Sequence, residues 1–232
     1  MSNFRLLVTR KISPSLVLRA GLNGIEILEK EFIAVEPIVS EEISSRIKKT
    51  ISSQTKFAFT SRNAVHAVAA NMDTPAENLK IYCLEGATAK EVKKLIGNEK
   101  IAGTAKNAEG LGEVIVNAGE KKIAFFCGNL RRDELPAILS AAGIEVEEII
   151  VYETVLLPQQ IIDDFEAIAF FSPSAVKSFF SVNSLRNHVI CLSVGDTTGD
   201  AIKKLCKNKT LTSKMPSEES VLELAKEIKN NL

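Results

Sequence analysis

The sequence predicts an α/β protein with parallel sheets, built from two related halves. Short apolar runs alternate with amphipathic helical stretches along all 232 residues, an order typical of parallel sheets covered by helices on both faces. The segment Phe59–Val65, Phe-Thr-Ser-Arg-Asn-Ala-Val, returns about 110 residues later as Phe170–Val176, Phe-Phe-Ser-Pro-Ser-Ala-Val. An offset of this size indicates a duplicated α/β domain rather than a short solenoid repeat.

Eight short apolar runs are predicted to form strands: Leu6–Thr9, Phe32–Val35, Lys56–Phe59, Ile81–Leu84, Ile123–Phe126, Val146–Tyr152, Ala167–Phe171 and Val189–Val194. Apolar residues at three- and four-residue spacing predict helices between them in Ala64–Ala70, Lys90–Ile96, Leu135–Ala142 and Ala201–Cys206.

Several residues mark the expected helix ends. Ser13-Pro14 and Ser172-Pro173 place serine at the N-cap and proline at the first helical position, where its missing N–H costs nothing. The last helix is expected to follow Ser217. Gly24 and Gly143 each follow a helical stretch and open a Gly-Ile-Glu segment, as glycines just past a helix end do.

The domain organisation follows from these signals only in part. Residues 4–36 and 121–155 share the order strand, helix, Gly-Ile-Glu, strand. The two halves could form sequential domains, or they could exchange units so that one domain is discontinuous, and periodicity alone does not choose. Glu36-Pro37 and Leu157-Pro158 are the expected crossings between domains, because each proline follows the second strand of its unit.

Size and charge limit the classes of function. With 232 residues and 45% apolar side chains, the chain can form two small domains or one large one. Its 29 basic and 29 acidic residues give no net charge, which argues against a general nucleic-acid binder. No apolar run is long enough to span a bilayer. Residues 1–10 lead directly into a strand without the apolar segment of a signal peptide, so we expect a cytoplasmic protein without membrane partners.

The sequence gives no sign of a metal, a disulfide or a cofactor. The cysteines lack CxxC spacing, and neither histidine has a second metal ligand nearby. We therefore expect reduced thiols and no metal; the residues concerned are Cys83, Cys127, Cys191, Cys206, His66 and His188. A Walker A sequence is missing, and Gly110-Leu111-Gly112 lacks the third glycine of a dinucleotide-binding loop. A nucleotide-using enzyme is therefore disfavoured, and no Ser/His/Asp set suggests itself.

Four hydroxyl side chains recur at equivalent places in the two halves: Ser61, Thr88, Ser172 and Thr198. Each could simply cap its helix. Together, however, they lie where the carboxyl end of a strand meets a helix, and open α/β sheets bind ligands outside those ends. Helix N-termini also favour anions. We therefore interpret the four hydroxyls as ligand contacts on two surfaces that could clamp a large anion between two domains.

Two further elements fit an anionic ligand. After the strand that ends near Phe126, Gly128 allows a close backbone approach, and Arg131 and Arg132 are expected to open a helix. Cations there oppose the helix dipole, so a carboxylate site explains them better than a solvated helix start. Tyr152 could be an ordinary half-buried strand residue, but its place beside a domain crossing would aim its phenol at the cleft.

An ordered set of short blocks between residues 56 and 206 resembles the uroporphyrinogen-III synthase family. The blocks are Phe59–Val65, Phe126–Arg132 with Leu135-Pro136 and Gly143, Val151–Val155, Phe170–Val176, and Gly195–Thr198 with Ala201. The first 50 residues match the family only in pattern. The chain departs from the family at Glu85, where a glycine equivalent to Gly195 is usual, and Gly86 stands one place later.

The resemblance implies a fold and an activity. The fold would be two flavodoxin-like domains with parallel sheets joined by two strand linkers, with residues 1–36 and 156–232 in a discontinuous domain and residues 37–155 in an inserted one. The enzyme, a cyclising hydro-lyase of haem biosynthesis and a monomer, would convert hydroxymethylbilane to uroporphyrinogen III with loss of water and inversion of ring D. A non-catalytic two-domain module that binds an anionic small molecule is the alternative.

The resemblance also implies roles for individual residues. Tyr152 would be catalytic, donating a hydrogen bond to the departing hydroxyl. The expected substrate-binding residues are Ser61, Arg62, Asn63, Thr88, Cys127, Gly128, Asn129, Arg131, Ser172, Ser174, Ala175, Thr197 and Thr198. Either Arg131 or Arg132 would supply charge.

Overall fold

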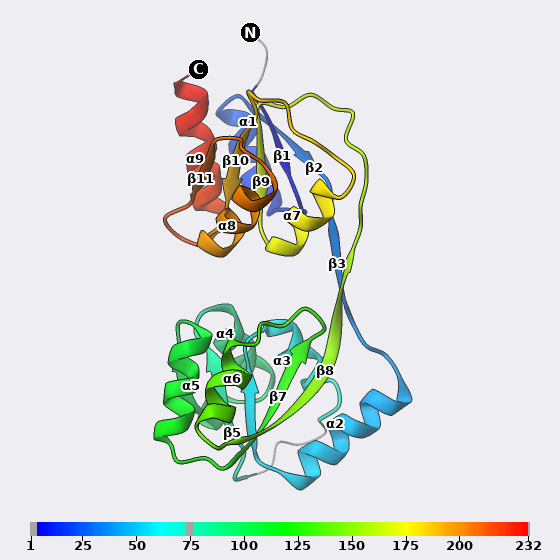
Figure 1. Cartoon of the computed structure of the whole chain (residues 1–232), viewed down its shortest axis with the longest axis vertical. Helices are drawn as coiled ribbons and strands as arrows, with labels where there is room; N and C mark the ends of the chain where they lie inside the picture. Colours follow the sequence, from blue (N-terminus) through cyan, green and yellow to red (C-terminus); the bar gives the residue numbers. More distant parts are fainter. Residues whose placement is uncertain (1–3, 73–76, 232) are drawn as a thin grey trace. The chain divides into compact units, whose positions relative to one another are not determined.

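The computed structural model describes residues 4–72 and 77–231, which form two compact α/β units (Figure 1). Unit 1 consists of Met1–Ala34 with Val155–Leu232, and unit 2 consists of Val35–Thr154. The outermost residues of the domains expected from the sequence, 1–3 and 232, lie outside the described residues.

Unit 1 contains a five-stranded parallel sheet in the order β11-β10-β9-β1-β2. Its strands are β1 (Phe4–Val8), β2 (Ile25–Glu29), β9 (Ala167–Phe170), β10 (Ile190–Ser193) and β11 (Thr210–Thr212). From β1 the chain continues to β2 on one side, whereas from β9 it continues to β10 and β11 on the other. The direction of winding therefore reverses between β1 and β9.

Helices cover both faces of this sheet. Helices α1 (Pro14–Leu22) and α9 (Glu218–Asn230) share one apolar core with β1, and α7 (Pro173–Phe180) and α8 (Asp196–Leu205) share the other with β9. Within α7, Phe179 meets Phe170 of β9 edge to face, with ring centroids 5.6 Å apart. This contact fixes the helix that follows the carboxyl end of β9.

Unit 2 contains a six-stranded sheet in the order β3-β8-β7-β4-β5-β6. Its strands are β3 (Ile33–Pro37), β4 (Lys56–Phe59), β5 (Lys80–Leu84), β6 (Ile101–Ala105), β7 (Lys122–Gly128) and β8 (Glu145–Leu156). The pairs from β8 to β6 are parallel. Here the winding reverses between β7 and β4, since β7 leads to β8 and β4 leads to β5 and β6.

The helices of unit 2 are arranged in the same way. One face is covered by α2 (Glu41–Ser53), α3 (Arg62–Ala69) and α4 (Ala87–Leu95). The other is covered by α5 (Ala108–Asn117) and α6 (Glu134–Ala141), which lie side by side in Figure 1. A short 3-10 helix, η1 (Asn98–Lys100), precedes β6.

The expected α/β class with parallel sheets is confirmed, and each of the eight expected strands is present. Gly24 and Gly143 follow α1 and α6 with φ of 69° and 74°, so their predicted place just past a helix end is also confirmed. The prediction missed β2, β6 and β11 as separate strands, and α2 among the helices. Strands β6 (Ile-Ala-Gly-Thr-Ala) and β11 (Thr-Leu-Thr) have one large apolar residue each, so their apolar signal is weak. Strand β2 (Ile-Glu-Ile-Leu-Glu) has three, but it was read only as the Gly-Ile-Glu segment that follows the helix.

One buried polar pair ties β5 to the turn before β7. The Tyr82 hydroxyl donates a 2.7 Å hydrogen bond to the Glu120 carboxylate, and both residues are buried. Burial, followed by this hydrogen bond and the charge of Glu120, raises the pKa of Tyr82. The phenol therefore stays protonated at neutral pH and satisfies a carboxylate that has little access to water.

We expect Tyr82→Phe to lower the free energy of unfolding by about 1.5–3 kcal/mol, because the buried Glu120 carboxylate loses its short donor. Denaturant unfolding at pH 7 measures this change, with Tyr152→Phe as the matched control that should change stability by less than about 0.5 kcal/mol. Equal small losses in both variants would mean that Glu120 does not depend on Tyr82.

Candidate functional site

The candidate site lies where the winding of unit 2 reverses, at the carboxyl ends of β4 and β7. The loops that leave these two strands diverge to opposite faces of the sheet, which opens a crevice between them. A cavity of about 360 Å³ occupies this place. Its polar lining comes from Thr60, Ser61, Lys106, Asn107, Arg131, Arg132, Glu134 and Tyr152, with Gly128. The cavity thus carries three cationic side chains and one carboxylate in a chain that has no net charge.

The ring of Tyr152 lies directly over Gly128. Cys127 pairs with Ile150 but Gly128 pairs with Tyr152, so β8 has an extra residue, Val151, at this point. Such a bulge re-aims a side chain. A Cβ on Gly128 would lie 2.5 Å from Tyr152 Cε2 and 2.9 Å from its hydroxyl oxygen. The close approach that the sequence suggested at Gly128 is therefore made by the ring of Tyr152.

The two arginines precede α6 rather than opening it. The Arg131 N–H donates to the Gly128 carbonyl at 3.2 Å, so a turn follows β7 and delays the helix. Asp133 is the N-cap of α6, and its first turn carries Glu134. The expectation that Arg131 and Arg132 open the helix is therefore wrong, because both precede its N-cap.

Arg131 is held by two carboxylates. Its Nε donates to Glu148 and its Nη1 donates to Asp133, and these bonds, that with Asp133 foremost, raise the pKa of Arg131. Arg132 is more loosely held, at 3.8 Å from Glu134 with 58% of its side chain exposed. Both arginines line the cavity, and both can present N–H groups to a carboxylate.

Two other predicted residues beside β7 have structural roles for their side chains. Cys127 is 1% exposed, and burial raises the pKa of its thiol to about 11. It is therefore a thiol at neutral pH and offers a ligand only its backbone. The Asn129 Oδ1 accepts a 2.9 Å hydrogen bond from the Thr154 N–H, which fastens the loop after β7 to β8.

The start of α3 forms the opposite wall. Ser61 caps this helix by accepting a 3.2 Å hydrogen bond from the Asn63 N–H, and its hydroxyl proton remains available to a ligand. Arg62 is exposed at the first helical position. Asn63 lines a second cavity of about 200 Å³, which Tyr152 also lines.

Thr88 does not belong to the lining of the 360 Å³ cavity. It is 6% exposed in the first turn of α4, whose N-cap is Gly86 with φ of 73°. The equivalent N-cap of α8 is Gly195. The departure at Glu85 therefore leaves a glycine N-cap in both halves, with the buried threonine at the second helical position in α4 and at the third in α8.

In unit 1 the corresponding place is the reversal between β1 and β9. Ser172 caps α7 by accepting a 3.2 Å hydrogen bond from the Ala175 N–H. Ser174 is half-buried, and Ala175 is buried. In the first turn of α8, Thr197 is exposed and Thr198 is 4% exposed. The structure places all the predicted residues of this unit at the carboxyl edge of its sheet.

The sequence reasoning missed Arg10 and Lys106. Arg10 follows β1, its guanidinium lies 4.4 Å from the centroid of the Phe171 ring, and it pairs with Glu218 at 2.7 Å. Arg10 could have been found, because the strand before it was predicted and the carboxyl end of a strand is where a ligand group is expected. Lys106 follows β6, which has a single large apolar residue, Ile101, and was not predicted as a strand.

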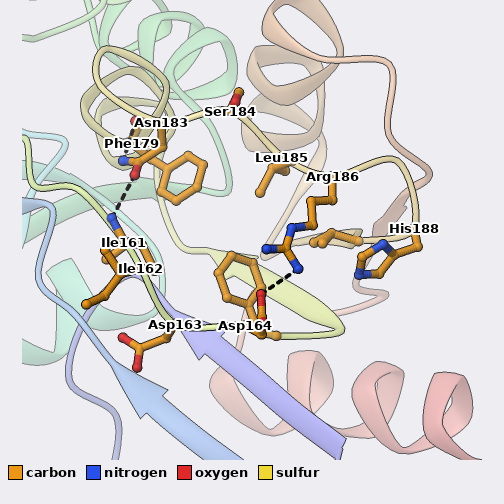
Figure 2. Close-up of a pocket in the computed structure, with 12 residues that line it drawn as sticks. Ile161, Ile162, Asp163, Asp164, Phe179, Asn183, Ser184, Leu185, Arg186 and His188 are labelled. Carbon is orange, nitrogen blue, oxygen red and sulfur yellow. Dashed lines mark hydrogen bonds and ion pairs between the residues drawn. The ribbon is translucent and has the colours of Figure 1, made fainter.

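A separate cavity of about 90 Å³ lies at the opposite, amino-terminal edge of the unit 1 sheet (Figure 2). Two of its charged groups pair with each other: Arg186 is turned toward Asp164 and lies 2.6 Å from it. A third, Asp163, pairs with Arg5 at 3.8 Å. The Asn183 side chain accepts from the Ile161 N–H and donates to two backbone carbonyls. This cavity is not the candidate site, because it lies away from the carboxyl ends of the strands, where open α/β sheets bind ligands.

In the described part of the chain, no three His, Cys, Asp or Glu residues are grouped so that they could hold a metal ion. Within residues 4–72 and 77–231, no helix combines the length and apolar character needed to cross a membrane.

Comparisons with known proteins agree with the sequence resemblance. The family model described as "Uroporphyrinogen-III synthase HemD" matches residues 16–223. The crystal structure of uroporphyrinogen-III synthetase from Helicobacter pylori is similar with a TM-score of 0.70 and 20% identity, covering 97% of this chain and 99% of that one. A mutant uroporphyrinogen III synthase from Thermus thermophilus is similar with a TM-score of 0.69 and 16% identity, covering 98% of each chain. At these identities the structural likeness establishes the fold.

We expect Gly128→Ala to lower the free energy of unfolding by about 1–3 kcal/mol, because the new methyl group must displace the ring of Tyr152. The loss should shrink when Tyr152→Ala is added, since the ring that clashes is then absent. Gly21→Ala is the control: no heavy atom lies within 4 Å of its added Cβ, and alanine favours a helix. If Gly128→Ala lowers the free energy of unfolding equally in the wild type and in the Tyr152→Ala background, the contact between Gly128 and the Tyr152 ring is contradicted.

Proposed function

Because the chain belongs to the uroporphyrinogen-III synthase family, whose enzymes act in tetrapyrrole biosynthesis, we propose that it closes hydroxymethylbilane into uroporphyrinogen III. The reaction releases water and inverts ring D. The observation that carries this proposal is the cation-lined cavity at the reversal of winding in unit 2, with Tyr152 fixed at its wall over Gly128.

The residues of this cavity suit a flexible polyanion with acetate and propionate side chains. Lys106 and Arg132 supply positive charge, and Ser61 supplies a hydroxyl donor. Free backbone N–H groups at the start of α3 add donors without formal charge. In unit 1, the starts of α7 and α8 provide the same kind of donors through Ser172, Ser174, Ala175, Thr197 and Thr198. Such a set binds carboxylates while the whole protein remains neutral.

The reaction needs positioning and a proton donor. The departing hydroxyl takes up a proton to leave as water, and the ring carbon that forms the new bond releases one, so one group can give and recover the same proton. Tyr152 has this role in our proposal, since a phenol can act as a general acid. Spontaneous closure would leave ring D uninverted, so holding the chain ends in the reactive geometry is the other contribution of the enzyme.

Further features belong to the same proposal. The two units would be flavodoxin-like domains, the first discontinuous, joined by two strand linkers. The order β2-β1-β9-β10-β11 supports this, because it corresponds to the 2-1-3-4-5 order of flavodoxin. The enzyme would be a hydro-lyase that works as a cytoplasmic monomer without a cofactor.

The decisive assay uses purified protein and hydroxymethylbilane made enzymatically in the same vessel. Oxidation of the products to porphyrins and chromatographic separation of the isomers should give mainly type III. Formation of type I at the uncatalysed rate would refute the proposed activity.

We expect Tyr152→Phe to reduce the rate of type III formation by roughly 10²-fold, the lower end of general-acid contributions. The type I isomer should gain share, because its formation needs no enzyme. Affinity for uroporphyrin III, the stable oxidised product, should change little, since the lost hydrogen bond matters mainly in the transition state. Full activity in this variant would assign catalysis to positioning alone.

Thr198→Val tests the helix-start donors of unit 1. The N-cap of α8 is Gly195 rather than Thr198, so removing the hydroxyl should leave the melting temperature nearly unchanged. Affinity for uroporphyrin III should fall by about 1 kcal/mol, the size of one neutral hydrogen bond. Ser172→Ala provides the contrast, because Ser172 caps α7 and its loss should also cost about 1 kcal/mol of stability. Unchanged affinity in Thr198→Val would remove Thr198 from the binding residues.

A further inference from the structure

The guanidinium of Arg131 lies between two carboxylates that differ in their surroundings. Glu148 is bonded at Nε and Asp133 at Nη1. The Arg131 and Glu148 side chains are 26% and 30% exposed, whereas that of Asp133 is 90% exposed. The ion pair with Glu148 is therefore better shielded from water than the ion pair with Asp133.

Glu148 is the fixed partner. It lies within β8, where it pairs with Phe125 of β7, and its backbone carbonyl accepts a 2.9 Å hydrogen bond from Arg46 of α2. The strand and this contact fix the backbone that carries the carboxylate. The bond at Nε consequently sets the plane of the Arg131 guanidinium and leaves its two Nη atoms for other acceptors.

Asp133 is the exchangeable partner. Exposed ion pairs add little stability, because water competes for both groups. Asp133 is also the N-cap of α6, a position where aspartate usually accepts a hydrogen bond from its own helix, yet its side chain makes no such bond. Its carboxylate is bonded to Arg131 and leaves the free N–H groups of α6 without their usual partner.

We propose that Asp133 stands in for a carboxylate of the substrate at Arg131 and is displaced when the substrate binds, while Glu148 keeps the guanidinium in place. This inference rests on the function proposed above. Arg131 lines the cavity, so an acetate or propionate group can replace Asp133 at the Nη atoms. The released Asp133 side chain, which is already 90% exposed, then returns to water, so giving up this exposed ion pair costs little. Asp133 thus lowers the affinity of Arg131 for anions that offer only weak contacts elsewhere.

The test is Asp133→Asn, which removes the competing charge and keeps a good N-cap residue. KM for hydroxymethylbilane and Kd for uroporphyrin III should both fall by about two- to fivefold, the usual range for an exposed pair. The effect should vanish in an Arg131→Ala background, because Asp133 and the substrate carboxylate then have no guanidinium to compete for. Asp133→Ser, a second uncharged N-cap, should reproduce the gain if the asparagine variant folds poorly.

Glu109→Gln is the matched control, since it removes one carboxylate from the first turn of α5. It should leave KM nearly unchanged. An equal fall in KM for Glu109→Gln, or a gain from Asp133→Asn that persists without Arg131, would overturn the inference in favour of a general charge effect. No gain in either Asp133 variant of an enzyme that forms type III would also overturn it, whereas a wild type that forms only type I would instead overturn the proposed function.

Discussion

The contact between the ring of Tyr152 and Gly128 is the constraint around which the site of unit 2 is arranged. Gly128 ends β7, and the bulge in β8 places Tyr152 opposite it. A phenol held in this way has its position fixed before a ligand arrives, as the proposed role of Tyr152 requires. The same turn after Gly128 places Arg131 beside the cavity. One glycine therefore sets the place of both the phenol and the guanidinium.

The two units have the same kinds of polar groups at corresponding places. In each, the winding of the sheet reverses beside a strand that is followed by a serine-capped helix, at Ser61 and at Ser172. The donors at these places are hydroxyls and backbone N–H groups, supplemented by single cations such as Lys106 and Arg10. Because these groups act locally, the absence of net charge on the chain does not conflict with the proposed polyanionic substrate.

The sequence predicted those parts of the site that depend on short-range signals. An apolar run followed by a serine reveals the end of a strand and the start of a helix, which is why Ser61 and Ser172 were found. The bulge in β8 and the pairing of Arg131 with Glu148 depend on contacts between segments about 20 residues apart, and no local pattern encodes them. Lys106 was missed because the edge strand before it has only one large apolar residue, Ile101.

The central claim, that ligand binding occurs at the carboxyl edges of both sheets, is tested most directly by amide chemical-shift mapping with uroporphyrin III. Our account predicts the largest changes in residues 60–63, 106–108 and 128–132 of unit 2 and in residues 172–176 and 195–199 of unit 1. Changes confined to residues 161–165 and 183–189, around the cavity at the amino-terminal edge of unit 1, would contradict it.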